Sequence, residues 1–279
     1  MRKKEFNDFF KLYAQNVDKA DKQYFWKLSD ALIIEIIKKN IFDPGESGTI
    51  LDAGGGSARW VIKLCEHYRA HFTVYDLSED MLVQARHNLL KSNFKNRVTL
   101  VHGDIVKMNN IATGSIDHIL SIYSPLSFID KKAEAISEMY RILKPGGKIA
   151  IMGHGHYNAV ASKINNSIAL PSELYKMNKT YRVKWAQHVP ELNTFSKESL
   201  ENLLSDSGFT PIITYGVPVF IQPGPEDFDL ENKKYSKISK ALENRDFFES
   251  IFSIEMEHNS KSTVINRGMN VFSIATKHY

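Results

Sequence analysis

The chain has 279 residues, of which 43% are hydrophobic and 24% charged, as is typical of soluble globular proteins. Its formal net charge of +4 is far from the strongly basic balance of a dedicated nucleic-acid-binding domain. The single cysteine, Cys65, excludes a disulfide scaffold, and since no apolar run resembles a membrane span or a secretory signal, we expect a cytoplasmic protein without membrane contact.

Residues 1–47 are expected to be helical. Aromatic residues recur at helical spacing near the start of the chain, at Phe6, Phe9, Phe10 and Tyr13. A second helix carries Phe25, Leu28, Leu32 and Ile36 on one face, and the Asp-Pro-Gly turn at 43–45 ends it. This segment either only packs against the rest of the protein or forms a lid over a ligand site, and we predict the lid.

The central stretch, residues 49–60, reads Thr-Ile-Leu-Asp-Ala-Gly-Gly-Gly-Ser-Ala-Arg-Trp. A short apolar strand leads through an acid and three glycines into a helical pattern at Val61, Leu64, Cys65 and Tyr68. Glycine allows a sharp turn and a close approach to a ligand, and the start of a helix suits an anionic group. A dinucleotide-binding fingerprint would need glycine or alanine where Arg59 stands, and a glycine turn without a ligand is the plain alternative.

Strands and helices then alternate as far as Met152. Predicted strands cover 72–75, 98–101, 116–122 and 148–152, and Ser78 is placed to cap the helix after the first of them. This alternation implies a parallel sheet with helices on both faces and a ligand at the carboxyl ends of its strands. Several polar or small residues fall at those ends, namely Asp52, Gly54, Asp76, Asp104 and Ser121.

The glycine stretch resembles motif I of class I S-adenosylmethionine (SAM) methyltransferases, with Asp52, Gly54 and Gly56 matching and Ala58 replacing a third glycine. The Leu-Lys-Pro-Gly-Gly turn at 143–147 is also frequent in that family, in its methyltransferase domain 11/25-like members. The resemblance covers about Ile50 to Gly208 and the end of the chain. It implies an α/β, Rossmann-like, doubly wound sheet of seven strands, six parallel and the last antiparallel, with a helical N-terminal lid and insertions.

The resemblance also implies SAM as the cofactor and roles for the residues around it. Asp76 would bind the ribose hydroxyls, Asp104 the adenine edge, and Asp52 would orient the glycine loop or the bound amino group. Gly54 and Gly56 would let the backbone approach the methionine part. The remaining candidates for the cofactor site are an aromatic cover, the apolar walls of the adenine pocket and one strand-end residue: Tyr13, Leu77, Met81, Ile105 and Ser121.

We divide the chain into a lid at 1–47, a SAM-binding core at 48–152 and 196–279, an insertion at 153–195 and a helical insertion at 217–262. Long insertions at the ligand end of such a sheet usually shape substrate sites. Candidate catalytic residues are His154 and Tyr123, and each could instead only pack or hydrogen-bond. Candidate contacts to the acceptor are His156, Tyr157, Tyr181 and Trp185. We expect no metal, because a zinc site at His154, His156 and His188 would still lack suitable further ligands.

These features predict a SAM-dependent methyltransferase that acts on O or N of a small-molecule acceptor, as a monomer or homodimer. Two aromatic-rich insertions and the lack of a basic stripe favour a small acceptor over nucleic acid. Two alternatives stay open: a tRNA or rRNA methyltransferase, and a SAM-fold binding protein without catalysis.

Overall fold

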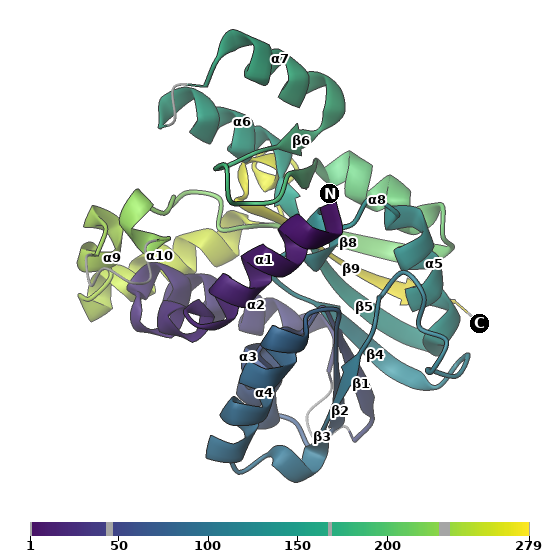
Figure 1. Cartoon of the computed structure of the whole chain (residues 1–279). Coiled ribbons are helices and arrows are strands. Elements are labelled where there is room, and N and C mark those ends of the chain that lie inside the picture. The colour runs from purple at the N-terminus through teal and green to yellow at the C-terminus, as the bar shows by residue number, and fades with distance from the viewer. Residues whose placement is uncertain (1, 43–46, 167–168, 229–234, 279) are drawn as a thin grey trace.

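The computed structural model describes residues 2–42, 47–166, 169–228 and 235–278 of the chain (Figure 1). A twisted sheet runs through the molecule, and helices cover both of its faces. The turn predicted at 43–45 lies outside the described residues. Among the described residues, no helix combines the length and the apolar character that crossing a bilayer requires.

The predicted doubly wound sheet, parallel except for its antiparallel last strand, is confirmed. The main sheet contains β1 (Thr49–Ala53), β2 (His71–Asp76), β3 (Val98–His102), β4 (Ile116–Ser121), β5 (Leu143–Gly155), β8 (Phe209–Val217) and β9 (Asn270–Lys277). Their order is β3-β2-β1-β4-β5-β9-β8. Strand β9 is antiparallel to both of its neighbours, β5 and β8, whereas β1 to β5 pair in parallel. The carboxyl ends of β1 to β5 therefore meet at one edge, where the sequence predicts a ligand.

Each face of the sheet has its own apolar core. On β1, Ile50 belongs to the core under α2 (Tyr24–Asn40), α3 (Arg59–Cys65) and α4 (Glu79–Lys91). The next residue, Leu51, belongs to the opposite core under α5 (Lys132–Ile142) and α8 (Lys197–Ser205). Alternate residues of a strand point to opposite faces, so this apolar run is buried on both sides, as expected for a central parallel strand.

The helix cap predicted at Ser78 is present, and a second helix is capped at Ser196. The Ser78 hydroxyl accepts a hydrogen bond from the Met81 N–H and begins α4. Ser196 makes a reciprocal capping box with Ser199 and begins α8. Caps of this kind satisfy backbone donors that the first turn of a helix leaves unpaired. Since α4 follows directly after Asp76, its cap also fixes the loop that carries that acid.

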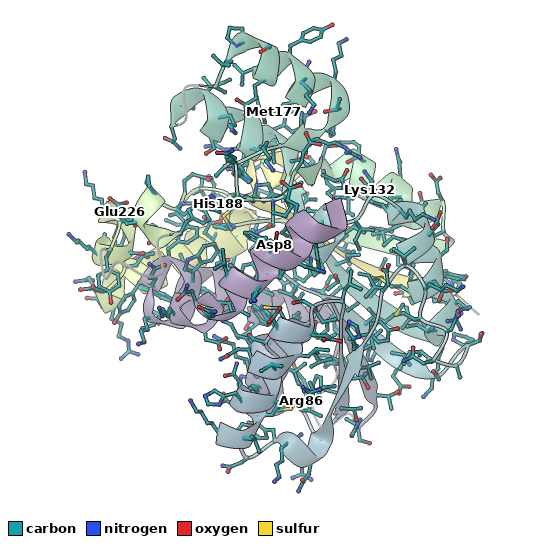
Figure 2. All side chains as sticks on the ribbon, viewed as in Figure 1. Asp8, Arg86, Lys132, Met177, His188 and Glu226 are labelled. Carbon is teal, nitrogen blue, oxygen red and sulfur yellow. The ribbon has the colours of Figure 1, made fainter. Side chains whose placement is uncertain are left out.

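The insertion after β5 is more ordered than the sequence indicated. It contains α6 (His156–Asn165), α7 (Pro171–Thr180), β6 (Arg182–Val183) and β7 (Leu192–Phe195). Strand β7 pairs in parallel with the last residues of β5, so the described sheet has nine strands, two more than predicted. Helices α6 and α7 stand apart from the sheet around a small apolar cluster that includes Met177 (Figure 2).

The N-terminal helix α1 (Arg2–Ala14) crosses the molecule beside the carboxyl ends of the central strands (Figure 1). The second predicted insertion contains α9 (Lys237–Ala241) and α10 (Arg245–His258), which pack near α2. The buried carboxylate of Glu255 on α10 accepts hydrogen bonds from three successive N–H groups, at Val219, Phe220 and Ile221. Helix α10 is thereby tied to the segment that leaves β8.

Candidate active site

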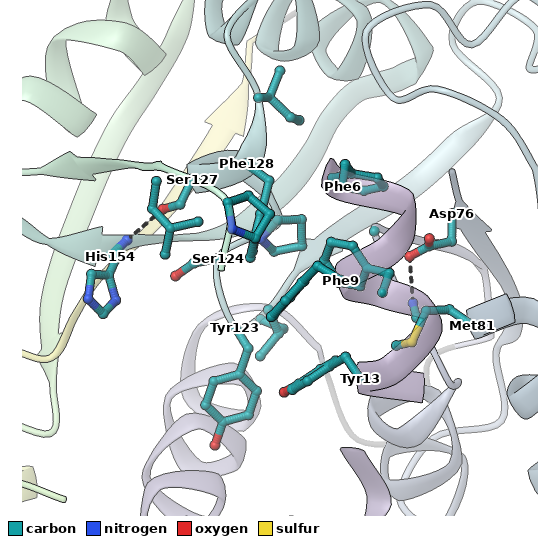
Figure 3. Close-up of a pocket in the computed structure, with 18 of the residues that line it drawn as sticks. Phe6, Phe9, Tyr13, Asp76, Met81, Tyr123, Ser124, Ser127, Phe128 and His154 are labelled. Carbon is teal, nitrogen blue, oxygen red and sulfur yellow. Dashed lines mark hydrogen bonds between the residues drawn. The ribbon is translucent and has the colours of Figure 1, made fainter. Parts of the chain in front are cut away.

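A cavity of about 660 Å³ lies at the carboxyl ends of the parallel strands. Its lining comes from α1, the loops after β1 to β4, the end of β5, the segment before β7 and the start of β9. Many of the residues predicted for the site line it: Tyr13, Gly54, Gly56, Asp76, Leu77, Met81, Asp104, Ile105, Tyr123, His154 and Trp185. Figure 3 shows how the side chains of this group converge from several elements.

The glycine loop forms part of the cavity wall and depends on having no side chains. Gly54 has a φ of +76°, and a Cβ atom there would lie 2.5 Å from the Cβ of Pro125. Gly56 has a φ of +55°, and a Cβ there would lie 2.6 Å from the Cε of Met81. Backbone in this region is readily adopted only by glycine. Both glycines are therefore required by conformation and by space.

Asp76 links the end of β2 to this loop. One of its carboxylate oxygens accepts from the Gly56 N–H at 2.9 Å, and the other accepts from the Ser78 N–H at 2.8 Å. Burial raises the pKa of Asp76, and the two hydrogen bonds oppose this effect by favouring the carboxylate. The carboxyl group lies at the cavity wall beside Met81 (Figure 3).

Asp52 lies beneath the loop and does not line the cavity. A Cβ built on Gly55 would be 2.6 Å from its Oδ2 atom, which is buried and has no hydrogen-bond partner within the described ranges. Burial, assisted by the negative charge of Asp76, raises the pKa of Asp52 to about 7. This position suits the orientation of the loop better than direct contact with a ligand.

The expectation for Ser121 needs correction. Its side chain is fully buried and donates a hydrogen bond of 2.9 Å to the backbone carbonyl of Ala53, which holds β4 against β1. It is not among the residues that line the cavity. A serine hydroxyl at a strand end can hydrogen-bond either to the backbone of the neighbouring strand or to a ligand. Its position in the sequence does not tell which of these two partners it has.

Helix α1 covers the cavity with an aromatic face. The rings of Phe6, Phe9 and Phe10 lie 6.2, 6.1 and 5.1 Å from the ring of Phe128, and Tyr13 stacks on Phe9 at 5.5 Å (Figure 3). An ion pair between Glu5 and Lys184 joins the helix to the insertion. The contacts between α1 and the body of the protein are thus mainly apolar.

Tyr123 follows β4 in an unusual backbone conformation. Its φ is +58° and that of Ser124 is +66°, a pair of left-handed residues that costs free energy in a folded chain. The Tyr123 hydroxyl donates to the buried carboxylate of Asp30 at 2.5 Å. Burial and the charge of Asp30 raise the pKa of Tyr123 well above its usual value. The phenol is therefore held neutral.

Asp30 connects this tyrosine with the start of α3. Its carboxylate also forms ion pairs with Arg59 and with Lys63, the latter at 2.8 Å. Arg59 lines the cavity, so the residue that breaks the dinucleotide fingerprint belongs to the site. The sequence does not predict a role for Asp30. A single acidic residue within a helical pattern looks the same in sequence whether its side chain is buried or exposed.

His154 near the end of β5 and Trp185 between β6 and β7 both line the cavity, with their rings edge to face at 5.5 Å. Burial lowers the pKa of His154 to about 4, and the neighbouring Asn270 side chain opposes this shift. The imidazole is therefore neutral near pH 7.

The other predicted acceptor contacts lie outside the cavity lining. His156 stacks on Tyr181 at 3.8 Å and hydrogen-bonds to Thr194, and Tyr157 is half exposed. Gly155 ends β5 and His156 begins α6, so the direction of the side chains changes between His154 and His156. The geometry gives no support to acceptor roles for these three residues.

Several lining residues were not predicted. The clearest are Trp26, Trp60, Phe128, Phe228 and Asn270, which come from five different segments. Trp26 and Trp60 lie within sequence patterns that also predict a buried helix at α2 and a helix start at α3. The sequence therefore gives no separate reason to place them in a ligand site. Within the described ranges, no three His, Cys, Asp or Glu side chains gather in a way that could hold a metal ion.

Comparison with known proteins agrees with this geometry. Residues 50–147 match the family model described as a methyltransferase domain. Over 108 residues, the chain is 33% identical to a demethylmenaquinone methyltransferase of Listeria monocytogenes, an alignment that covers 38% of this chain. The chain spans only 44% of that relative's length.

Two solved structures resemble the fold over most of its length. A candidate methyltransferase of Haloferax volcanii, solved in complex with the Trm112 methyltransferase activator, superposes with a TM-score of 0.60 at 14% identity, covering 97% of this chain and 98% of that one. A candidate SAM-dependent methyltransferase of Methanococcus maripaludis gives 0.53 at 25% identity, covering 74% and 88%. The chain therefore has the Rossmann-like fold of class I methyltransferases, and its residues 50–147 form a methyltransferase domain of that SAM-dependent class.

Proposed function

We propose that this protein is a methyltransferase that transfers a methyl group from SAM to a small-molecule acceptor. The observation that carries the proposal is the meeting of the glycine loop, Asp76 and Asp104 in one cavity at the carboxyl ends of β1 to β3. A ligand in that position lies against the backbone of Gly54 and Gly56. It also meets the Asp76 carboxylate, which can accept hydrogen bonds from ribose hydroxyls. Leu77, Met81 and Ile105 supply apolar surface for an adenine ring.

The rest of the cavity is available to the acceptor. It lies beyond the ends of β4 and β5, between the aromatic face of α1 and the segment that carries Trp185. SAM supplies an activated methyl group when bound, and this chain contributes orientation and exclusion of water. Phe128 and the α1 phenylalanines are suited to exclude water, because they close the cavity with apolar contacts.

Of the two candidate catalytic residues, His154 is the better supported. Its imidazole is neutral, lines the cavity and has an Nε2 atom without a partner among the described residues. Tyr123 donates its hydroxyl proton to Asp30 and stays protonated, so it is unsuited to act as a base. We assign Tyr123 to the wall between cofactor and acceptor.

A direct test is transfer of labelled methyl from SAM to a library of small acceptors by purified protein, read by mass spectrometry. The proposal predicts a methylated small product that is lost in the Asp76→Ala variant. Methylation of RNA instead, with binding that weakens steeply as salt rises, would favour the RNA methyltransferase alternative. Tight SAM binding without any transfer would favour the non-catalytic alternative.

A further inference from the structure

His154 on β5 and Asn270 on β9 lie side by side on neighbouring strands of the sheet. They form a directly opposed pair in the antiparallel register of these strands, and both line the cavity. Side chains of opposed residues lie on the same face of a sheet and within contact distance. Asn270 is 3% exposed, and its Oδ1 atom accepts a hydrogen bond of 2.9 Å from the Ser124 hydroxyl. The amide is thereby fixed in one orientation.

This pair keeps two buried polar atoms without partners in the part of the chain that the structure describes. They are the Nε2 atom of His154 and the Nδ2 atom of Asn270. Leaving a buried polar group unpaired costs about 1 to 3 kcal/mol, so such atoms in a cavity wall indicate a ligand that pairs with them. Asn270 Nδ2 can only donate, and a neutral imidazole nitrogen without a proton can accept. A hydroxyl group meets both requirements at once.

The charged side chains around the same compartment are already engaged. Asp130 pairs with Arg182 at 2.8 Å, and Glu191 pairs with Lys176 at 2.7 Å. Lys131 pairs with Glu134, and the buried Asp227 accepts from Ser239. The remaining surface is largely apolar, and its aromatic part comes from Phe6, Phe10, Phe128, Trp185 and Phe228. Such a lining favours an uncharged, flat, apolar molecule over an amine cation or a phosphate.

We infer that the acceptor is an uncharged aromatic or similarly flat compound bearing a hydroxyl group, and that Asn270 and His154 recognise this group for methylation at oxygen. The inference rests on the proposed function and specifies its acceptor. Both residues lie beyond the matched domain, residues 50–147, so the inference rests on this chain's own structure.

In the proposed step, Asn270 donates its N–H to the acceptor oxygen and His154 accepts the hydroxyl hydrogen bond. The oxygen lone pair attacks the methyl carbon, the O–CH₃ bond forms, and the electron pair of the breaking S–CH₃ bond stays on sulfur. The oxygen becomes strongly acidic as it gains the methyl group. A weak base such as the buried His154 can therefore take the proton, which leaves a neutral ether and a neutral thioether.

Calorimetric titration with four matched probes tests the recognition. The probes are para-phenylphenol, para-methoxybiphenyl, biphenyl carboxylate and phenylbenzylamine, each titrated into protein with and without S-adenosylhomocysteine. We expect para-phenylphenol to bind at least tenfold more tightly than the other three. Equal or tighter binding of a charged probe or of the methyl ether, or no binding of the phenol up to its solubility, would overturn the inference.

The variant Asn270→Leu should weaken phenol binding at least tenfold and leave affinity for S-adenosylhomocysteine within about threefold, which also reports an intact fold. If that variant fails to fold, Asn270→Asp keeps the shape and the bond from Ser124, removes the donor, and should weaken phenol binding equally. The matched control is Asn158→Leu on α6, whose amide bonds to Gln222 outside the cavity lining. Unchanged phenol binding in the Asn270 variant that folds would contradict the role of this residue.

A methyl-transfer assay distinguishes failure of this inference from failure of the proposed function. Incubation of wild-type protein with SAM and para-phenylphenol should yield para-methoxybiphenyl, at a rate that falls at least tenfold in His154→Ala. Transfer to carbon or to an amine instead would overturn oxygen as the target and leave methyl transfer itself intact. Failure of SAM and S-adenosylhomocysteine to bind folded protein would reject the proposed function, and with it the methylation step inferred here.

Discussion

The backbone N–H of Gly56 donates a hydrogen bond of 2.9 Å to the carboxylate of Asp76 and so joins the glycine loop to the end of β2. These two residues lie twenty positions apart in the chain, on two neighbouring strand–loop units. The same carboxyl group accepts from Ser78 at the start of α4, so it fixes the loops on both sides of the proposed ribose position. Loss of this group should therefore affect cofactor binding before it affects the sheet.

We predict that Asp76→Ala weakens SAM binding by about 1.5 to 3 kcal/mol, the range for a lost hydrogen bond to a charged group. This corresponds to roughly a 10- to 150-fold higher Kd, measured by calorimetry. The control is Asp80→Ala on the first turn of α4, which is exposed and outside the cavity lining. Normal SAM affinity in Asp76→Ala would mean that another group binds the ribose.

Gly56→Ala and Gly114→Ala form a matched pair. Both glycines have positive φ, +55° and +63°, so a side chain strains the backbone by about 1 kcal/mol at each. Only at Gly56 would the new Cβ also meet another atom, the Met81 Cε at 2.6 Å, whereas nothing lies within 4 Å at Gly114. We expect Gly56→Ala to lose more thermal stability than Gly114→Ala, and SAM binding to be impaired at least tenfold in Gly56→Ala alone. Equal SAM affinity in the two variants would show that the loop does not contact the cofactor.

The raised pKa of Asp52 predicts a pH dependence of stability. Since this pKa rises from 3.8 to about 7 on folding, the folded protein holds the proton more tightly than the unfolded chain does. The stabilisation is complete below about pH 4 and is lost as pH rises through about 7, by up to about 4 kcal/mol. Urea unfolding of wild type and Asp52→Asn should show a difference in stability that grows in favour of the variant between pH 5 and pH 8. A constant difference would contradict this account.

Closure by the N-terminal segment should be visible in hydrogen exchange. Helix α1 packs beside α4, its aromatic rings contact Phe128, and Glu5 pairs with Lys184, whereas β1 to β5 are buried in two cores. We expect α1 to exchange faster than the strands in free protein and to gain protection when S-adenosylhomocysteine is added. Protection of α1 equal to that of the strands, and unchanged by the ligand, would count against a lid.

The sequence predicts the parts of this protein that repeat a local pattern. The central parallel strands, the cap at Ser78 and the acids at the ends of β2 and β3 follow from periodicity and from the resemblance to motif I. Strand β7 could not be predicted in the same way, because four residues that pair with only the last two of β5 leave no periodic signal.

The acceptor side of the cavity is the part that sequence predicts least. Asn270 is the first residue of β9 and reads as a strand boundary, and Asp30 reads as part of an ordinary helix. Their positions depend on tertiary contacts: Asn270 pairs with His154 on the neighbouring strand, and Asp30 contacts Arg59 and Tyr123 directly. His156 and Tyr157 follow His154 directly and Tyr181 lies in the same insertion, but the start of α6 at His156 turns the chain away from the cavity.

The central claim is that the cavity formed by the glycine loop, Asp76 and Asp104 binds SAM, and calorimetric titration of the purified protein with SAM and S-adenosylhomocysteine tests it most directly. We predict saturable binding of both compounds with one site per chain and Kd values in the micromolar range, about −8 kcal/mol. Absence of heat and of any thermal shift with either compound, in protein shown to be folded, would contradict the claim.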